Sequence, residues 1–205
     1  MSQFKPNCLP LLIGSLPSEN HRESVELIFD YTPEIPLWPQ LPVFEQEGMI
    51  RQYVPGFPGI TERDGKMFVD TEKAGFEEEL LAFYEEYLMV SDGGAEMDGT
   101  RFILSREVAK GFYDFLEIAA AKKAGVVALK GQTTGPVTFC TGLVDQAGRA
   151  IFYDDQLRDA AIKHLAMKAR WQVRKMGEIL ERTIMFFDEP ALAGLGSSAF
   201  ITITD

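Results

Sequence analysis

The sequence has few of the residues that build disulfide frameworks and metal centres. Only two cysteines, Cys8 and Cys140, and two histidines, His21 and His164, occur in 205 residues. Two cysteines are too few for a disulfide framework, and their spacing matches no metal motif. No His-x-His or Cys-x-x-Cys pair is present either. We therefore expect a reducing, cytoplasmic compartment and no metal site built by this chain.

Long apolar runs and an excess of positive charge are also missing. No apolar run approaches the roughly 18 residues of a membrane-spanning helix. The first residues, MSQFKPNCLP, lack the apolar core of a signal peptide. The formal net charge is −11, whereas binding to nucleic acid requires a basic stripe. The sequence therefore predicts neither a membrane nor a nucleic acid as a partner.

What the sequence does contain is the composition of one globular domain. Hydrophobic residues make up 46% of the chain, which is enough for residues 1–205 to bury a single core. Short apolar runs without polar alternation are separated by helical patterns, as is typical of a parallel sheet covered on both faces. We therefore expect an α/β fold with strands near 11–13, 35–38, 125–129 and 183–187 and helices over 19–31, 76–87, 108–119 and 154–181.

Local signals add shorter elements and helix starts to this outline. Ser18, Ser105 and Thr134 have side chains suited to capping a helix, and Pro136 suits a first helical turn. Residues 55–105 are expected to form an insertion rich in helix. We expect a hairpin strand over 66–70 and one helical turn over 47–53. A further short strand is expected over 150–153.

The strongest predicted strands end in polar or glycine-rich residues. Gly14 and Ser15 follow the first, Gly131–Thr134 follow the third, and Asp188 and Glu189 follow the last. Chemistry in parallel α/β folds collects at the carboxyl ends of the strands. These strand ends are therefore the predicted site.

Asp188 and Glu189 are the most informative pair within it. A carboxylate at the end of a buried strand is costly to desolvate, so it has a function or a partner. The pair could receive an ammonium group or handle a proton. Alternatively, Asp188 caps a turn and Glu189 forms a surface salt bridge. Side chains alternate along a strand, so only one of the two is expected to face a site.

The glycine-containing strand ends have two interpretations each. The helix predicted to begin at Pro136 would present free N–H groups to an anionic ligand beside Thr134 and Gly135. A plain strand–helix turn explains the same residues. Gly14 and Ser15 allow a close backbone approach to a ligand, or they form an ordinary turn. Neither stretch matches the phosphate-binding or dinucleotide-binding glycine motifs.

His164 and Cys140 are better explained by packing than by chemistry. His164 lies in the middle of a predicted helix, so a packed or solvent-facing position is favoured over a ligand role. Cys140 follows Pro136 within a predicted helix and has no histidine nearby in sequence. A small core residue is therefore favoured over a thiol nucleophile.

Three motifs together resemble a known family. IGSLP at 13–17, TGPVT at 134–138 and DEPAL at 188–192 occur in the same order in the cobalamin-independent methionine synthase family. The chain resembles the catalytic barrel of those enzymes, within the superfamily shared with uroporphyrinogen decarboxylase. The arginine-rich N-terminal signature of the decarboxylase branch is absent, so the resemblance to the synthase branch is closer.

The resemblance implies a TIM barrel that transfers a methyl group to a thiol with zinc. The donor would be tetrahydrofolate or a corrinoid protein, and the acceptor a small thiol or amino acid. In that family the Ile-Gly-Ser element and the DEP aspartate hold the amino acid substrate, and Glu45 is the nearest candidate for a glutamate that contacts its amino group. The predicted substrate-binding residues are Ile13, Gly14, Ser15, Glu45, Thr134, Gly135, Asp188 and Glu189.

The sequence also departs from the family pattern. Gly194 stands where the family has a folate-binding glutamate, and the family's zinc ligands, which follow the DEP strand, have no counterpart. We therefore expect a truncated (β/α)8 barrel with about half of the strands, with zinc only in the intact family protein. No catalytic residue is identified, turnover by this chain alone is not expected, and open strand edges predict a homo-oligomer.

Two other functions remain open on the sequence. One is a barrel that decarboxylates a polycarboxylated ring without a cofactor, as in the uroporphyrinogen decarboxylase branch. The acidic balance and the lack of arginines near the strand ends count against it. The other is a non-catalytic binding or assembly module.

Overall fold

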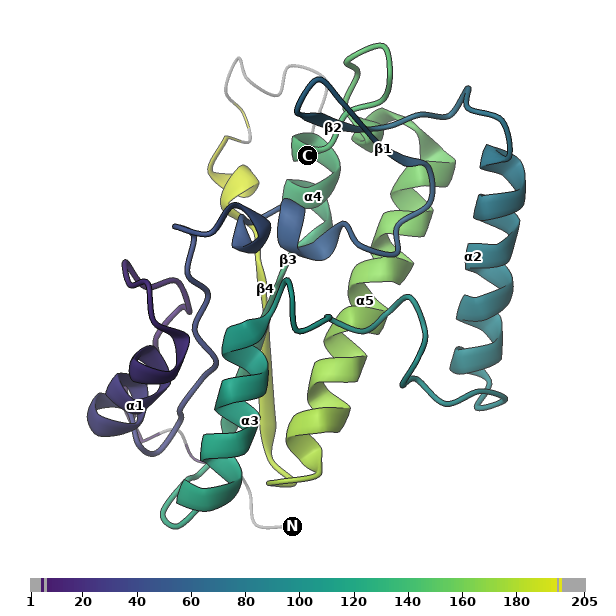
Figure 1. Cartoon of the computed structure of the whole chain (residues 1–205). Coiled ribbons are helices and arrows are strands. Elements are labelled where there is room, and N and C mark those ends of the chain that lie inside the picture. Colours follow the sequence, from purple (N-terminus) through teal and green to yellow (C-terminus); the bar gives the residue numbers. More distant parts are fainter. Residues whose placement is uncertain (1–4, 6, 195, 197–205) are drawn as a thin grey trace. The chain divides into compact units, whose positions relative to one another are not determined.

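The protein has a mixed α/β fold. A computed structural model describes residues 5, 7–194 and 196 (Figure 1). No helix in these residues is long and apolar enough to cross a membrane. The helices are α1 His21–Tyr31, α2 Phe76–Ser91, α3 Lys110–Lys122, α4 Pro136–Gly142 and α5 Asp155–Gly177, with 3-10 turns η1 Glu45–Glu47, η2 Arg51–Tyr53, η3 Ile151–Tyr153 and η4 Pro190–Gly194. The strands are β1 Ile60–Arg63, β2 Lys66–Val69, β3 Leu129–Thr134 and β4 Thr183–Asp188.

The chain divides into two compact units. Unit 1 consists of Met1–Gly48, Ser105–Gln132 and Gln172–Phe186. Unit 2 consists of Met49–Leu104, Thr133–Trp171 and Phe187–Asp205. Each unit is described separately below.

Unit 1 contains parallel backbone pairings that follow the order of the sequence. Ser15 bridges Gln40, and Leu37 bridges Lys130, both in parallel. β3 then pairs with β4. The Leu129 amide donates to the Arg182 carbonyl in unit 1, and the Gly135 amide, one residue after β3, donates to the Asp188 carbonyl in unit 2. The acceptor is 53 residues further on in both cases, so these strands are also parallel. The described residues form no closed barrel.

The third predicted strand is misplaced in the sequence analysis. β3 covers Leu129–Thr134, every residue of which is buried, whereas the expected strand covered 125–129 and left 131–134 in a loop. The amides of Val127 and Ala128 do donate to the Glu34 carbonyl, so pairing begins in the apolar run. Polar side chains continue the strand because, as shown below, they find buried partners.

The last predicted strand is confirmed in position but not in burial. β4 covers Thr183–Asp188, and its residues are half-buried except for the exposed Phe187. An apolar run without alternation predicted a strand covered on both faces. In the structure, part of this apolar surface stays accessible.

Helices α1 and α3 pack beside each other in unit 1 (Figure 1). The expected helix over 19–31 is confirmed, but its cap is Asn20, whose side chain accepts from the Glu23 amide. Ser18 Oγ instead accepts from the Asn20 amide. α3 begins at Lys110 without a side-chain cap, so the predicted cap Ser105 is wrong. The amides of Val108 and Ala109 donate to the Ser105 carbonyl and form a separate turn before the helix.

Unit 2 contains the β1–β2 hairpin and the pair α2 and α5. The hairpin is antiparallel, as expected for 66–70. The single helical turn expected near 47–53 is present as η1 and η2, the first of which lies in unit 1. The prediction of a strand over 150–153 is wrong, because the segment forms the 3-10 turn η3.

The core of unit 2 is an aromatic cluster around the fully buried His164. The rings around it are those of Phe57, Phe83, Phe102 and Phe139.

Candidate functional site

The predicted site residues fall into two groups, one in each unit. Unit 1 holds Ile13, Gly14, Ser15 and Glu45. Unit 2 holds Thr134, Gly135, Asp188 and Glu189.

The group in unit 2 joins two of the three sequence motifs directly. The Gly135 amide donates to the Asp188 carbonyl at 2.9 Å. The Ala191 amide donates to Thr138 Oγ1 at 3.2 Å. The TGPVT and DEPAL motifs, fifty residues apart in the chain, therefore form one structural junction, which we call the motif junction (134–138 with 188–191).

Glu189 connects the two motifs through both of its carboxylate oxygens. Its Oε1 accepts from the Val137 amide at 2.9 Å, and its Oε2 accepts from the Thr138 amide at 2.7 Å. Both amides lie in the first turn of α4. The free N–H groups expected there for an external anion therefore already bind a carboxylate of the chain itself.

Gly135 is required by this arrangement. A Cβ atom at this position would lie 2.1 Å from the Glu189 carboxyl carbon, well inside van der Waals contact. Gly135 is also the N-cap of α4. The expected cap, Thr134, is wrong, because its hydroxyl donates to the Met49 carbonyl at 2.7 Å.

Asp188 is the last residue of β4 and is half-buried. Successive side chains of an extended chain point in opposite directions. Glu189 turns toward α4, so this alternation predicts that the Asp188 side chain leaves the chain on the other side.

Three residues of the group in unit 1, Ile13, Gly14 and Ser15, line a small apolar pocket. It has a volume of about 290 Å³ and is lined by 11–16 with Ile28 and Leu37. The side chain of Ile13 is 71% exposed, and Ser15 is exposed as well. Gly14 is buried with φ of +150°, and a Cβ there would lie 2.9 Å from the Gln132 amide group. Glycine at this position therefore allows the close approach of the chain to β3.

Beneath Gly14 lies a buried polar network that the sequence analysis did not identify. Lys130 Nζ donates to the Ile13 carbonyl and to Gln132 Oε1, and it stands 4.4 Å from the centre of the Phe186 ring. Gln132 Nε2 donates to the Trp38 carbonyl at 2.8 Å. Its signal in the sequence is the polar residues at alternate positions of 130–134, where a loop is predicted.

The network continues through α5. Trp38 Nε1 donates to Gln172 Oε1 at 2.9 Å, and Gln172 Nε2 donates to the Gln132 carbonyl at 3.0 Å. Trp38, Gln132 and Gln172 are all fully buried. Buried polar groups with such partners rigidify the surrounding core.

The two glutamates of the second segment have different surroundings. Glu45, the expected site residue, is exposed at the start of η1. Glu47 is buried, and its carboxylate accepts from His21 Nε2 at 2.5 Å and from the Leu41 amide at 2.8 Å. The ring of Phe44 stacks on His21. Sequence spacing alone did not distinguish Glu47 from its neighbour two residues earlier.

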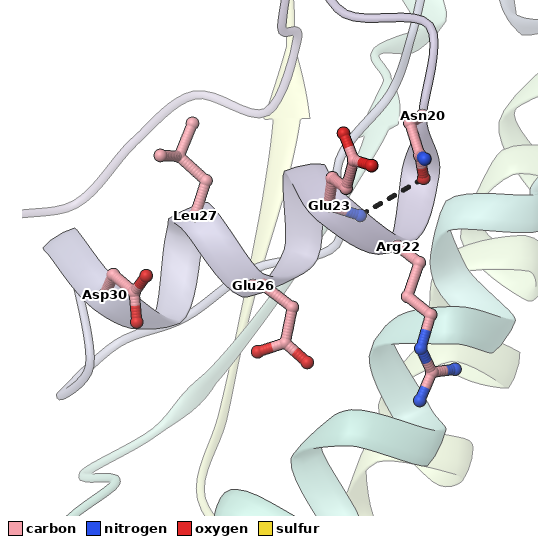
Figure 2. A pocket seen from close by; sticks show the side chains of 6 residues that line it. All are labelled: Asn20, Arg22, Glu23, Glu26, Leu27 and Asp30. Atoms are coloured by element: carbon pink, nitrogen blue, oxygen red, sulfur yellow. Dashed lines mark hydrogen bonds between the residues drawn. The ribbon is translucent and has the colours of Figure 1, made fainter.

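A second hollow in unit 1 lies along α1 and contains none of the predicted site residues. It has a volume of about 430 Å³, and Figure 2 shows its charged side chains along one helix. Arg22 pairs with Glu117, and Glu26 pairs with Lys122. These charges connect α1 with α3 and are explained by that packing.

The described residues do not fit a metal centre. No three of their histidine, cysteine, aspartate or glutamate side chains gather in a position to hold an ion. Cys140 is buried, and burial raises the pKa of its thiol to about 12. This thiol is therefore protonated at neutral pH and unsuited as a nucleophile, in agreement with its assignment to the core.

Comparison with protein-family models, with curated proteins and with solved structures finds no match for this chain. The functional argument therefore depends on the motifs and their geometry.

Proposed function

We propose that the chain is a member of the methionine synthase-like methyltransferase family, within the superfamily shared with uroporphyrinogen decarboxylase, and that its motif junction belongs to the amino-acid-binding part. One observation carries this proposal: the TGPVT and DEPAL motifs meet through hydrogen bonds in unit 2. Two segments fifty residues apart that meet so closely are expected where both contribute to one site.

The proposed fold is one half of a (β/α)8 barrel. Parallel pairings run in sequence order from 15 to 40, from 37 to 130 and from β3 to β4. Neighbours in sequence that are also neighbours in a parallel sheet are the signature of such barrels. Doubly wound sheets, by contrast, reverse their strand order at a switch point.

Asp188 is the proposed partner of the substrate's ammonium group. It ends a strand, and carboxyl ends of barrel strands are where substrates bind. A carboxylate bound to an ammonium group forms a charge-assisted hydrogen bond, which is roughly twice as strong as a neutral one.

Zinc and the methyl donor are not assigned to the described residues. In the family that the chain resembles, zinc activates the thiol that accepts the methyl group. Because no described cluster fits a metal, we derive no methyl-transfer step from these residues. Tetrahydrofolate and a corrinoid protein both remain proposed donors.

Calorimetric titration with L-homocysteine tests the proposal. The wild type should bind, and Asp188→Asn should weaken binding at least tenfold, because a charge-assisted bond contributes about 1.5–3 kcal/mol. Asp30→Asn, an exposed acid on α1, is the matched control and should bind like the wild type. Equal affinity of Asp188→Asn and wild type, or binding of a tetrapyrrole but not of homocysteine, would contradict it.

A further inference from the structure

Glu189 is part of a short segment, 188–191, that is bonded to the start of α4. Its two carboxylate oxygens each accept one backbone N–H of α4. The Asp188 carbonyl is fixed by the Gly135 amide, and the Ala191 amide is fixed by Thr138 Oγ1. Residues 188–191 are therefore attached to 135–138 at four points.

The geometry requires a glutamate at this position. Both acceptor oxygens are used, so a glutamine would direct its NH2 group toward a backbone N–H donor. An aspartate is shorter by one methylene and could not reach both amides from the same backbone. The absence of a side chain at Gly135 makes room for the carboxylate, since a Cβ would meet it at 2.1 Å.

We propose that Glu189 is a positioning residue for amino acid binding: it fixes the Asp188 carboxylate by clamping the motif junction and does not itself contact the ligand. This inference rests on the proposed function, in which Asp188 binds the substrate's ammonium group. It assigns different roles to two adjacent carboxylates. Asp188 recognises the amine, and Glu189 sets the position from which it does so.

A purely structural cap predicts something different. Losing a helix cap costs about 1 kcal/mol of stability and leaves the affinity of the folded protein for its ligand unchanged. A positioning residue changes affinity selectively, for ligands that carry the amino group. Two ligands that differ only in this group separate the two roles.

The experiment uses Glu189→Gln in the full chain with L-homocysteine and with 4-mercaptobutanoate, which lacks the amino group. The dissociation constant for homocysteine should rise about tenfold, equivalent to about 1.4 kcal/mol, while that for 4-mercaptobutanoate stays within about twofold. Glu178→Gln, which makes the same charge change at an exposed glutamate, should affect neither. Equal weakening of both ligands, or wild-type affinity for homocysteine, overturns the proposal.

A second measurement does not depend on ligand binding. NMR couplings about χ1 of Asp188 should report one rotamer in the wild type and rotamer averaging in Glu189→Gln, while the amide resonances of Val137 and Thr138 shift. If the wild type binds no homocysteine but Asp188 loses its single rotamer in the variant, the proposed function fails and the clamp stands. If those amides shift while the Asp188 couplings stay unchanged, the clamp fails.

Discussion

The buried polar groups of unit 1 and unit 2 have contrasting surroundings. In unit 1, Gln172 donates to the Gln132 carbonyl and accepts from Trp38 Nε1, and Gln132 donates to the Trp38 carbonyl, so the fully buried side chains of this network have partners. In unit 2, among the described residues, His164 Nδ1 has no hydrogen-bond partner. The neighbouring Lys168, also fully buried, donates to the Ile103 carbonyl and to no carboxylate of the residues that the structure describes.

The difference shows that burial of a polar group does not have one fixed effect. A satisfied network stabilises and specifies a core, whereas a buried cation without a carboxylate lowers stability until it is neutralised. Burial lowers the pKa of Lys168 to about 7. Burial and, next, the charge of Lys168 lower the pKa of His164 well below its usual range.

Breaking the network of unit 1 should have the largest effect. Gln172→Leu removes the acceptor of Trp38 Nε1 and the side-chain amide that donates to the Gln132 carbonyl. Each unsatisfied buried group costs about 1–3 kcal/mol, so we expect a loss of about 3 kcal/mol in thermal or denaturant unfolding. Gln156→Leu, at an exposed position of α5, is the control, and an equal loss there would contradict this account.

Removing the buried cation of unit 2 should have the opposite sign. Lys168→Met should raise the free energy of unfolding by about 2 kcal/mol at pH 7, because it removes an unpaired buried charge. The unfolded lysine has a pKa of 10.5, so the unfolded wild type binds more protons than the folded one between pH 7 and 10.5. Wild-type stability should therefore rise with pH across this window, and the advantage of Lys168→Met should shrink.

Denaturant unfolding of both proteins at several pH values checks this prediction. The curves for wild type and Lys168→Met should converge as pH approaches 10. Parallel curves would show that Lys168 is not the titrating group.

A smaller effect is expected for His164, on the acid side. Its folded pKa is lowered, so the unfolded state binds more protons below about pH 6.5 and wild-type stability should fall as pH decreases from there. His164→Phe keeps a ring in the aromatic cluster and removes this titration. It loses the bond to the Tyr53 carbonyl, so we expect about 1 kcal/mol lower stability at pH 8 and a smaller deficit at pH 5. A deficit that is independent of pH would refute this.

The smallest effect should come from the surface of unit 1. Lys122 and Glu26 pair between α3 and α1 with both side chains over 40% exposed. Exposed pairs contribute about 0–1 kcal/mol. Lys122→Gln should therefore lower the melting temperature only slightly, and by even less at high salt. A large destabilisation would mean that the α1–α3 contact depends on this pair.

Much of the fold could be predicted from the sequence because it depends on local pattern. The positions of α1, the β1–β2 hairpin and β4 follow from apolar spacing and turn residues. β3 was misplaced because Lys130 and Gln132 are polar, and only their partners in the folded chain make them compatible with a buried strand. A sequence pattern records polarity and not the presence of a partner.

The candidate site shows the same limit. The motifs that carry Asp188 and Gly135 are recognisable in the sequence, and side-chain alternation predicts that only one of Asp188 and Glu189 faces a site, but the partners of Glu189 are not predictable. Its role depends on two backbone amides of 137 and 138, which no side-chain motif records. Glu47 was missed for a related reason, since its partners His21 and the Leu41 amide become neighbours only on folding.

The most direct test of the account is an experimental structure of the chain with L-homocysteine bound. We predict the amino nitrogen within about 3 Å of a carboxylate oxygen of Asp188, with Glu189 still bonded to the amides of Val137 and Thr138. An amino group bound away from Asp188, or a Glu189 that leaves α4 to contact the ligand, would contradict it.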